Sequence, residues 1–123
     1  MLSVETIDPM MELIAVVRPS AAAKTVRALE RVEQIAFTRW RAYGRGRQFG
    51  ITIENNGDRA QIEWLSKIVF TIMAPADRGE AVIQAIIDAN QTQNVGDGMI
   101  FVCPIDEEIS IRTGGRRTVV AEA

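Results

Sequence analysis

Histidine is absent from the 123-residue sequence, and cysteine occurs once, as Cys103. A chain without histidine cannot form a Ser-His-Asp or Cys-His catalytic site, and with one cysteine it cannot build a His/Cys zinc cluster. The single cysteine also excludes a disulfide within these residues. Cys103 ends the apolar run Ile100-Phe101-Val102-Cys103, which is typical of a buried structural thiol.

Long hydrophobic runs and a strong excess of one charge are also lacking. The longest apolar stretches are only a few residues long, which predicts no signal peptide, no membrane span and no direct membrane insertion. The cytoplasm is then the expected location. The net charge of −2 argues against general nucleic-acid binding, which depends on cationic surface. A chain of this length is expected to form one domain with a modest core, which a subunit interface would supplement.

Two glycine-rich segments are the main positive feature of the sequence. The first is Gly44-Arg45-Gly46-Arg47-Gln48-Phe49-Gly50, inside a cationic run over 39–48, and the second is Gly96-Asp97-Gly98. Glycines let the backbone bend sharply and approach a ligand, and arginines offer forked donors to phosphate or carboxylate oxygens. The two segments together predict an anion site. The alternative is a β-turn with solvated arginines.

The hydrophobic pattern predicts strands over 11–18, 35–43, 65–73 and 99–104, with a short fifth strand over 108–112. The strands 11–18 and 65–73 are apolar on both faces, so both faces should be covered. Ser20 is a possible cap for a helix over 21–33, and Pro75 suits the first turn of a second helix that ends near Asn90. Residues 43–64 form a long excursion with a turn signal at 55–58.

This order of elements is strand, helix, strand, strand, helix, strand. It predicts an α+β fold of the ferredoxin-like βαββαβ type, with an antiparallel sheet and two helices on one face. The other face is apolar and uncovered, so a homo-oligomer is expected. We expect this domain to span 11–114, after an N-terminal extension over 1–10 and before a C-terminal tail over 115–123, neither of which has a strong structural signal.

Five pieces of the sequence, in order, resemble the PII family of nitrogen-regulatory signal-transduction proteins. They are MELIAVVRP, GRGRQFG, LSKIVFTI, VGDGMIFVCP and ISIRTG, and they span residues 11–114. The GRGRQ form looks most like the nitrogenase-linked branch. The resemblance implies a homotrimer with nucleotide clefts between subunits, where ATP and ADP compete and where 2-oxoglutarate binds with Mg²⁺-ATP. It also implies a T-loop over about 43–64, which docks on a target enzyme or membrane transporter, and no catalysis on a substrate.

The resemblance also implies residue roles. Arg47 matches the arginine that reaches the nucleotide phosphates, Gln48 the glutamine that helps to hold Mg²⁺ beside 2-oxoglutarate, and Lys67 the lysine that pairs with a carboxylate of that ligand. The remaining matches are nucleotide-site positions, either around the base and ribose, in the B-loop at about 91–99, or at the C-terminal end: Val16, Thr38, Gly44, Gly46, Gly96, Asp97, Gly98 and Arg112.

The sequence departs from the family pattern at four positions. Met99 replaces the B-loop lysine and Ser110 replaces the first C-terminal arginine, which removes two charge-assisted contacts of about 1.5–3 kcal/mol each. The cleft is therefore expected to bind ATP less tightly, and ADP, AMP or another anion is an alternative ligand. Ala60 and Asp58 stand where other members are modified on tyrosine and serine, so those modifications cannot occur here.

Competing interpretations remain open at this stage. A degenerate PII-like adaptor would act by protein contact alone, and a single-stranded nucleic-acid module would use the basic and aromatic residues between 39 and 47. Arg47 and Gln48 could form a solvated turn, and Lys67 could be an edge lysine. Residues 96–98 could be a plain hairpin turn, and Arg112 a surface ion-pair residue. The tryptophans that flank the loop, Trp40 and Trp64, are typical of core or interface positions.

Overall fold

The structure is a computed structural model. It describes residues 4–7, 9–45, 51–55, 58–62 and 64–119, and side chains within 9–45 and 64–118. The strands are β1 (Val4–Ile7), β2 (Met10–Val17), β3 (Ala36–Gly44), β4 (Ile51–Asn55), β5 (Asp58–Ile62), β6 (Leu65–Pro75), β7 (Met99–Ile105), β8 (Glu107–Ile109) and β9 (Arg116–Val119). The helices are a 3-10 turn (Pro19–Ala21), α1 (Ala22–Glu30) and α2 (Ala76–Asn90).

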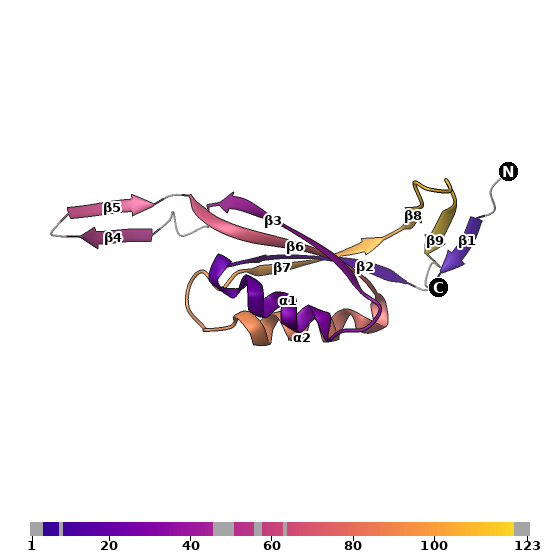
Figure 1. Cartoon of the computed structure of the whole chain (residues 1–123), viewed down its shortest axis with the longest axis horizontal. Coiled ribbons are helices and arrows are strands. Elements are labelled where there is room, and N and C mark those ends of the chain that lie inside the picture. Colours follow the sequence, from indigo (N-terminus) through magenta and orange to yellow (C-terminus); the bar gives the residue numbers. More distant parts are fainter. Residues whose placement is uncertain (1–3, 8, 46–50, 56–57, 63, 120–123) are drawn as a thin grey trace.

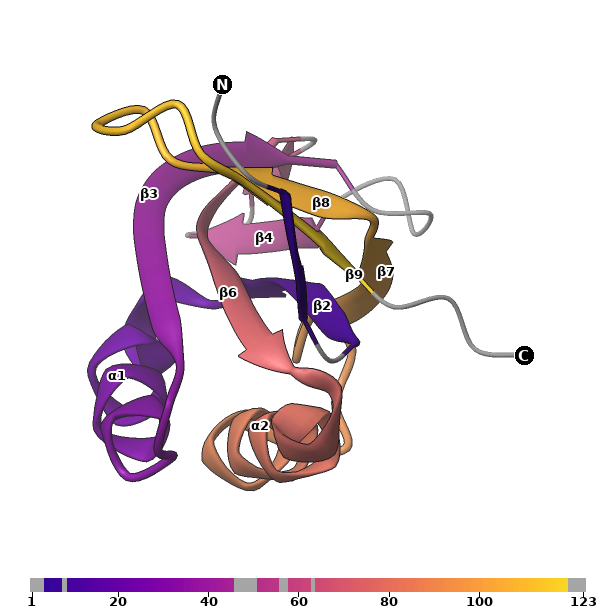
Figure 2. The same ribbon diagram turned by 90° about the vertical axis from the view of Figure 1, so that its right-hand side faces the viewer.

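The body of the molecule is a four-stranded antiparallel sheet with strand order β3-β6-β2-β7. Both helices lie on the same face of this sheet (Figures 1 and 2). The predicted ferredoxin-like α+β fold is therefore confirmed. Among the described residues, no helix is both long and apolar enough to cross a membrane.

The core lies between the sheet and the two helices. Alternate residues of β2 and β6 point toward the helices because successive side chains of a strand face opposite sides. Phe70, Leu13 and Ile72 are fully buried there. From the helices, Leu29 and Val82 meet them, also without exposed area.

A buried polar contact ties the two helices together. The Thr25 hydroxyl donates to the carbonyl of Ala21 at 2.8 Å, and the Asn90 side-chain amide donates to that hydroxyl at 2.9 Å. Asn90 is the last residue of α2, so the contact fixes where the following loop begins. The proposed Ser20 cap is wrong: neither the 3-10 turn nor α1 has a side-chain cap, because Pro19 starts the turn directly after Arg18.

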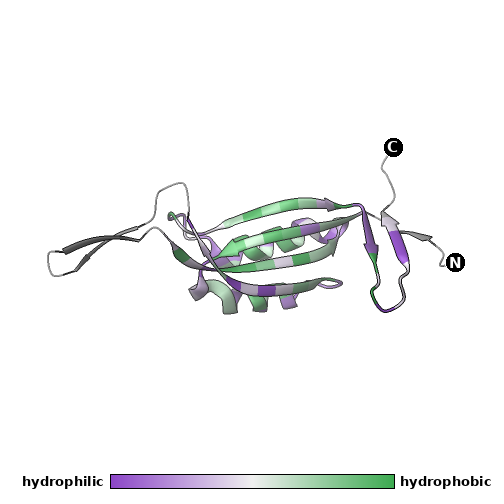
Figure 3. Ribbon diagram, turned by 90° about the horizontal axis from the view of Figure 1, so that it is seen from above, coloured by the Kyte–Doolittle hydropathy of each residue, from purple (hydrophilic) through white to green (hydrophobic). Residues whose placement is uncertain are grey.

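The second face of the sheet carries no helix, and the strands of the sheet consist largely of hydrophobic residues (Figure 3). One cross-strand row joins Trp40, Val69, Val16 and Met99 through the register of all four strands. Trp40 is 48% exposed and Met99 57% exposed. Cys103 is half-buried on the same face. It is not the buried core thiol that was expected, because strand alternation directs it away from the helices.

Strands β4 and β5 form a hairpin within the long segment between β3 and β6. Asn55 pairs with Asp58, the two ends of the segment where a turn was expected; residues 56–57 lie outside the described part of the chain. The hairpin projects beyond the ends of β3 and β6, away from the helices (Figure 1). The strands themselves were not anticipated, because few residues of this segment alternate in polarity.

The two chain ends form a further sheet, of order β1-β9-β8, at the opposite end of the molecule from the hairpin (Figure 1). β1 pairs with β9 in parallel, and β8 pairs with β9 in antiparallel orientation. No structural signal had been found in either terminal segment. The fifth strand expected at 108–112 ends earlier, at Ile109, and a turn follows it.

Candidate functional site

The loop between α2 and β7 is held by Arg18, the residue that follows β2. The Arg18 guanidinium donates to the carbonyl of Gly96 through Nε at 2.9 Å and to that of Val95 through Nη2 at 2.7 Å. Nη2 also lies 3.2 Å from the Asp97 carboxylate. Sequence reasoning missed Arg18, which is thus the side chain that connects this loop to the central sheet.

Asp97 folds back onto its own loop. Its carboxylate accepts hydrogen bonds from the backbone N–H of Thr92 at 2.7 Å and of Gln93 at 2.8 Å, and a short one from the Thr92 hydroxyl. The Thr92 hydroxyl and backbone, then Gln93 and the charge of Arg18, lower the pKa of Asp97 below its ordinary value of 3.8. The side chain therefore shapes the loop.

Gly96 and Gly98 are required by the backbone at this loop. Their φ angles are 98° and 119°, a region that favours glycine. A Cβ on Gly98 would lie 2.1 Å from the carbonyl oxygen of Val16. The loop backbone therefore packs directly on the end of β2, in a way that no other residue would permit.

Lys67 lies on β6 beside the same end of β2. Its side chain is half-buried and packs near Gly44, whose Cβ would lie 3.5 Å from Lys67 Cγ. Burial, and then the positive charge of Arg18, lower the pKa of Lys67 below 10.5. Two cations thus lie close together next to a glycine loop, an arrangement that an anion would stabilise.

The structure brings together part of the predicted site and separates the rest. Val16 is the register partner of Met99, so it lies directly beside the glycine loop. Thr38 is on β3, at the other edge of the sheet, and strands about 4.8 Å apart put these edges about 14 Å apart. Arg112 is exposed in the turn after β8, beyond the far end of β7.

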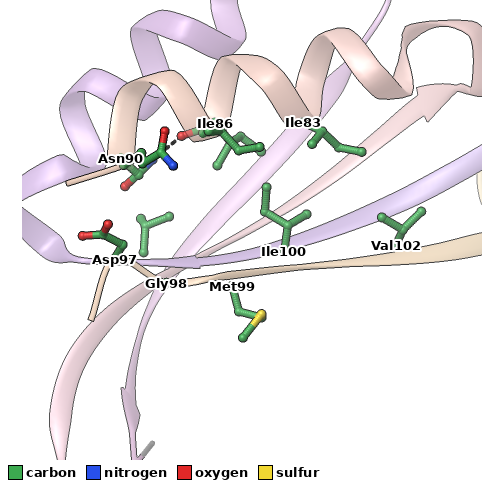
Figure 4. Close-up of a pocket in the computed structure, with 11 residues that line it drawn as sticks. Ile83, Ile86, Asn90, Asp97, Gly98, Met99, Ile100 and Val102 are labelled. Atoms are coloured by element: carbon green, nitrogen blue, oxygen red, sulfur yellow. Dashed lines mark hydrogen bonds between the residues drawn. The ribbon is translucent and has the colours of Figure 1, made fainter. Parts of the chain in front are cut away.

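An open groove of about 430 Å³ runs between α2 and β7 next to the loop. Ile83 and Ile86 on α2 face Ile100 and Val102 on β7, while Asn90 and Asp97 lie at one end (Figure 4). Met99 points to the other face of the sheet (Figure 4). The groove is therefore apolar along its length and polar where it meets the loop.

Comparison with known proteins decides the family. Residues 10–115 match the family model described as Nitrogen regulatory protein P-II. The chain belongs to the P-II family. It is 34% identical over 116 residues to the nitrogen fixation nifHD region glnB-like protein 2 of Methanococcus maripaludis, covering 87% of this chain and 96% of the relative. It is 35% identical over 112 residues to nitrogen regulatory protein P-II 2 of Methanothermobacter thermautotrophicus, covering 89% and 97%.

The structural comparison agrees. The crystal structure of Arabidopsis thaliana PII bound to citrate matches with a TM-score of 0.67 and 28% identity, covering 89% of each chain. The predicted family, including its nitrogenase-linked branch, is thus confirmed. The loop between α2 and β7 is the segment for which the B-loop was predicted.

The structure describes both residues that stand where the family pattern has a cation, Met99 and Ser110. Met99 is exposed on the apolar sheet face, as described above. The hydroxyl of Ser110 accepts the backbone N–H of Thr113 at 3.3 Å, and the backbone of Ser110 bonds to Gly114 and Gly115 at 2.7 and 2.9 Å. Ser110 therefore forms the turn that displays Arg112.

Several predicted P-II site residues lie outside the described part of the chain: Gly46, Arg47 and Gln48. For Asp58 and Ala60 the structure describes the backbone in β5 only. Among the residues with described side chains, there is no group of three or more cysteine or carboxylate residues that could hold a metal ion. Gln48, the predicted Mg²⁺ contact, lies outside that search.

Proposed function

We propose that this P-II protein is a cytoplasmic sensor that binds adenine nucleotide at clefts between the subunits of a homotrimer. It regulates a target enzyme or membrane transporter of nitrogen or carbon metabolism through residues 43–64. One observation supports this most strongly: Arg18 holds the glycine loop beside Lys67, so backbone and cations converge at one end of the sheet. In this proposal the output is a loop conformation, and no substrate is converted.

The distribution of the predicted nucleotide residues supports a cleft between copies. Gly96 to Gly98 lie at the β7 edge, whereas Thr38 lies on the β3 edge. If β3 of one copy meets β7 of the next, these residues come together. A heterologous contact of this kind closes into a ring when the rotation between copies leads back to the first copy. The exposed apolar face, which includes Trp40, provides surface for the interior of such a ring.

In the cleft, the B-loop over 91–99 is proposed to face the phosphates, with Arg47 of the T-loop and Arg112 of another copy as their cationic contacts. Val16, Thr38, Gly44 and Gly46 are proposed to surround the base and ribose. The B-loop suits this role because its acid, Asp97, is turned inward and paired with Arg18. It therefore projects little negative charge toward a phosphate.

The replacements at Met99 and Ser110 make a weaker triphosphate site the expected outcome. Each lost charge-assisted contact is worth about 1.5–3 kcal/mol. We propose that ADP or AMP competes better against ATP here than in members that keep both cations.

Lys67 and Gln48 are proposed as the 2-oxoglutarate contacts, with Gln48 also contacting Mg²⁺ carried by ATP. A dicarboxylate would relieve the repulsion that Lys67 experiences from Arg18 and would compensate its burial. The similar Arabidopsis PII has citrate bound, which supports recognition of small carboxylates by this fold.

Isothermal titration calorimetry tests the proposal. The purified chain is titrated with ATP, ADP and AMP, each with and without Mg²⁺ and 2-oxoglutarate, and Arg47→Ala, Gln48→Ala and Lys67→Ala are compared. We expect nucleotide affinity to fall in Arg47→Ala and the 2-oxoglutarate effect to fall in the other two. If no combination of nucleotide, Mg²⁺ and 2-oxoglutarate gives a heat of binding, the proposal that this protein senses these ligands is contradicted.

A ligand-independent adaptor is the second candidate. The exposed Met99 side chain at the start of β7 favours it, because an apolar group there suits protein contact better than phosphate contact. For an adaptor, target binding would persist unchanged in Arg47→Ala and Gln48→Ala, and adding nucleotide would not alter it.

A further inference from the structure

The sheet formed by the chain ends is a feature of this chain that the family match does not contain. The match covers residues 10–115, so β1 and β9 both lie outside it. Val4 to Ile7 nevertheless pair in continuous parallel register with Arg116 to Val119. Two additional segments, one at each end, therefore combine with β8, which lies inside the matched region.

Without β1, the β8–β9 hairpin would be a two-stranded sheet, with two exposed ion pairs across it among the described contacts. Arg116 pairs with Glu107 at 2.9 Å, and Arg117 pairs with Glu108. These side chains are about half exposed, and ion pairs of this kind contribute little stability. An isolated two-stranded hairpin is marginal in water, and a third strand is the usual requirement for persistence. β1 supplies that third strand, on the free side of β9.

The turn of this hairpin carries an apolar and cationic tip. Ile111 is 100% exposed and Ile109 49% exposed, and Arg112 follows them in the exposed turn. The seven residues of β7, at about 3.3 Å each, separate the hairpin from the B-loop by about 20 Å. Arg112 therefore lies too far from the B-loop of its own subunit to share a ligand with it.

We propose that β1 is a positioning strand: by pairing with β9 it holds the β8–β9 hairpin so that its turn delivers Arg112 into the nucleotide cleft of a neighbouring copy. This inference rests on the proposed nucleotide function. The hairpin is ordered before the ligand arrives, so binding does not have to fix the backbone of the turn at that moment. Loss of β1 pairing should weaken ADP binding about tenfold.

The test is the double variant Glu5→Pro/Thr6→Pro. In a strand, successive backbone N–H groups point to opposite sides, so the N–H of either Glu5 or Thr6 faces β9. Proline at both positions removes that N–H and its hydrogen bond to β9. The matched control, Glu5→Ala/Thr6→Ala, keeps both N–H groups. A second variant, which lacks residues 1–8, removes the strand altogether without touching the matched domain.

Four measurements are made on each protein. They are ADP affinity by calorimetry, the mass of the assembly by light scattering, hydrogen exchange of the residue 116–119 amides, and the loss of ADP affinity caused by Arg112→Ala. We expect the proline and deletion variants to keep the assembly, exchange these amides faster and bind ADP about tenfold more weakly, with the alanine control unchanged. Arg112→Ala should then cost much less affinity in the proline variant than in the unmodified chain, because β1 acts through Arg112.

Two outcomes would overturn the inference and can be told apart. If the unmodified chain binds ADP and the variants bind it equally well, β1 has no positioning role while the proposed function stands. If the unmodified chain binds no nucleotide, the proposed function and the inference fail together.

Discussion

The guanidinium of Arg18 lies 3.2 Å from the carboxylate of Asp97 and joins the end of β2 to the loop between α2 and β7. Both side chains are largely shielded, with 33% and 21% of their side-chain area exposed. The pair also neutralises the one acid of the glycine loop. The loop between α2 and β7, for which we propose the role of a B-loop, is thus held in shape by a contact to the central sheet.

Replacing Arg18 with alanine should loosen the B-loop, because two hydrogen bonds from a charged donor and one ion pair are lost. We expect the free energy of unfolding to fall by about 1–3 kcal/mol, and nucleotide affinity to fall with it. Urea denaturation and calorimetry measure the two effects. Arg18→Lys is the matched control, because it keeps the charge but cannot reach both carbonyls. Its stability and its nucleotide affinity should therefore lie between those of the unmodified chain and those of Arg18→Ala. Unchanged affinity in Arg18→Ala would show that the loop holds its shape without the contact.

Gly98→Ala should be the most damaging single change in the loop. The added Cβ would meet the Val16 carbonyl oxygen at 2.1 Å, in a backbone conformation with φ of 119°. A strained backbone of this kind costs about 1–3 kcal/mol, before any steric shift of β2. Gly115→Ala is the control, because its φ is not positive and its nearest neighbour is a side chain at 3.2 Å. Thermal unfolding compares the two, and equal melting temperatures would contradict this view of the loop.

The binding of an acidic ligand such as 2-oxoglutarate should depend on pH through Lys67. The pKa of Lys67 is lowered from 10.5 in the free protein, and a bound carboxylate would raise it again. Affinity should therefore fall as pH rises through that lowered value. The stability of the free protein changes with the opposite sign. The unfolded chain keeps the Lys67 proton to higher pH than the folded chain does, so the free energy of unfolding rises with pH between the lowered pKa of Lys67 and 10.5.

Calorimetry with 2-oxoglutarate and Mg²⁺-ATP across the alkaline range measures this dependence. Lys67→Gln cannot titrate, so its weaker binding should not vary with pH in the same interval. A pH dependence that persists in Lys67→Gln would assign the titration to another group.

Met99→Lys should strengthen nucleotide binding. The change restores a cation beside the glycine loop, and a charge-assisted contact of about 1.5–3 kcal/mol corresponds to roughly a tenfold to hundredfold gain in affinity. Because Met99 is 57% exposed in the single chain, the longer polar side chain has access to solvent there. Met99→Gln, similar in length but uncharged, is the control. Equal ATP affinity in all three proteins would place Met99 away from the phosphates.

The sequence was sufficient to predict the central fold for a physical reason. The strands 11–18 and 65–73 are apolar on both faces, so they had to lie inside a sheet, and the helices could occupy one face only. The signal for the β4–β5 hairpin is similarly local, because the sequence over 55–58 is of a kind that favours turns. Local chemistry therefore fixed the elements and most of their order.

Non-local contacts account for what sequence reasoning missed. Arg18 bonds to a residue 78 positions away, and nothing near Pro19 distinguishes it from a surface arginine. β1 and β9 come from opposite ends of the chain and pair in parallel, so no turn residue connects them in the sequence. The role predicted for residues 96–98 concerned their backbone amides, whereas the internal contacts of the Asp97 side chain to Thr92 and Gln93 were not predicted.

Native mass spectrometry of the purified chain with increasing ADP tests the central claim most directly, because it reports assembly and ligand number together. The account predicts a trimer that takes up ADP in steps, to one molecule for each cleft between subunits. A monomer, or a trimer whose mass does not change at any ADP concentration, would contradict it.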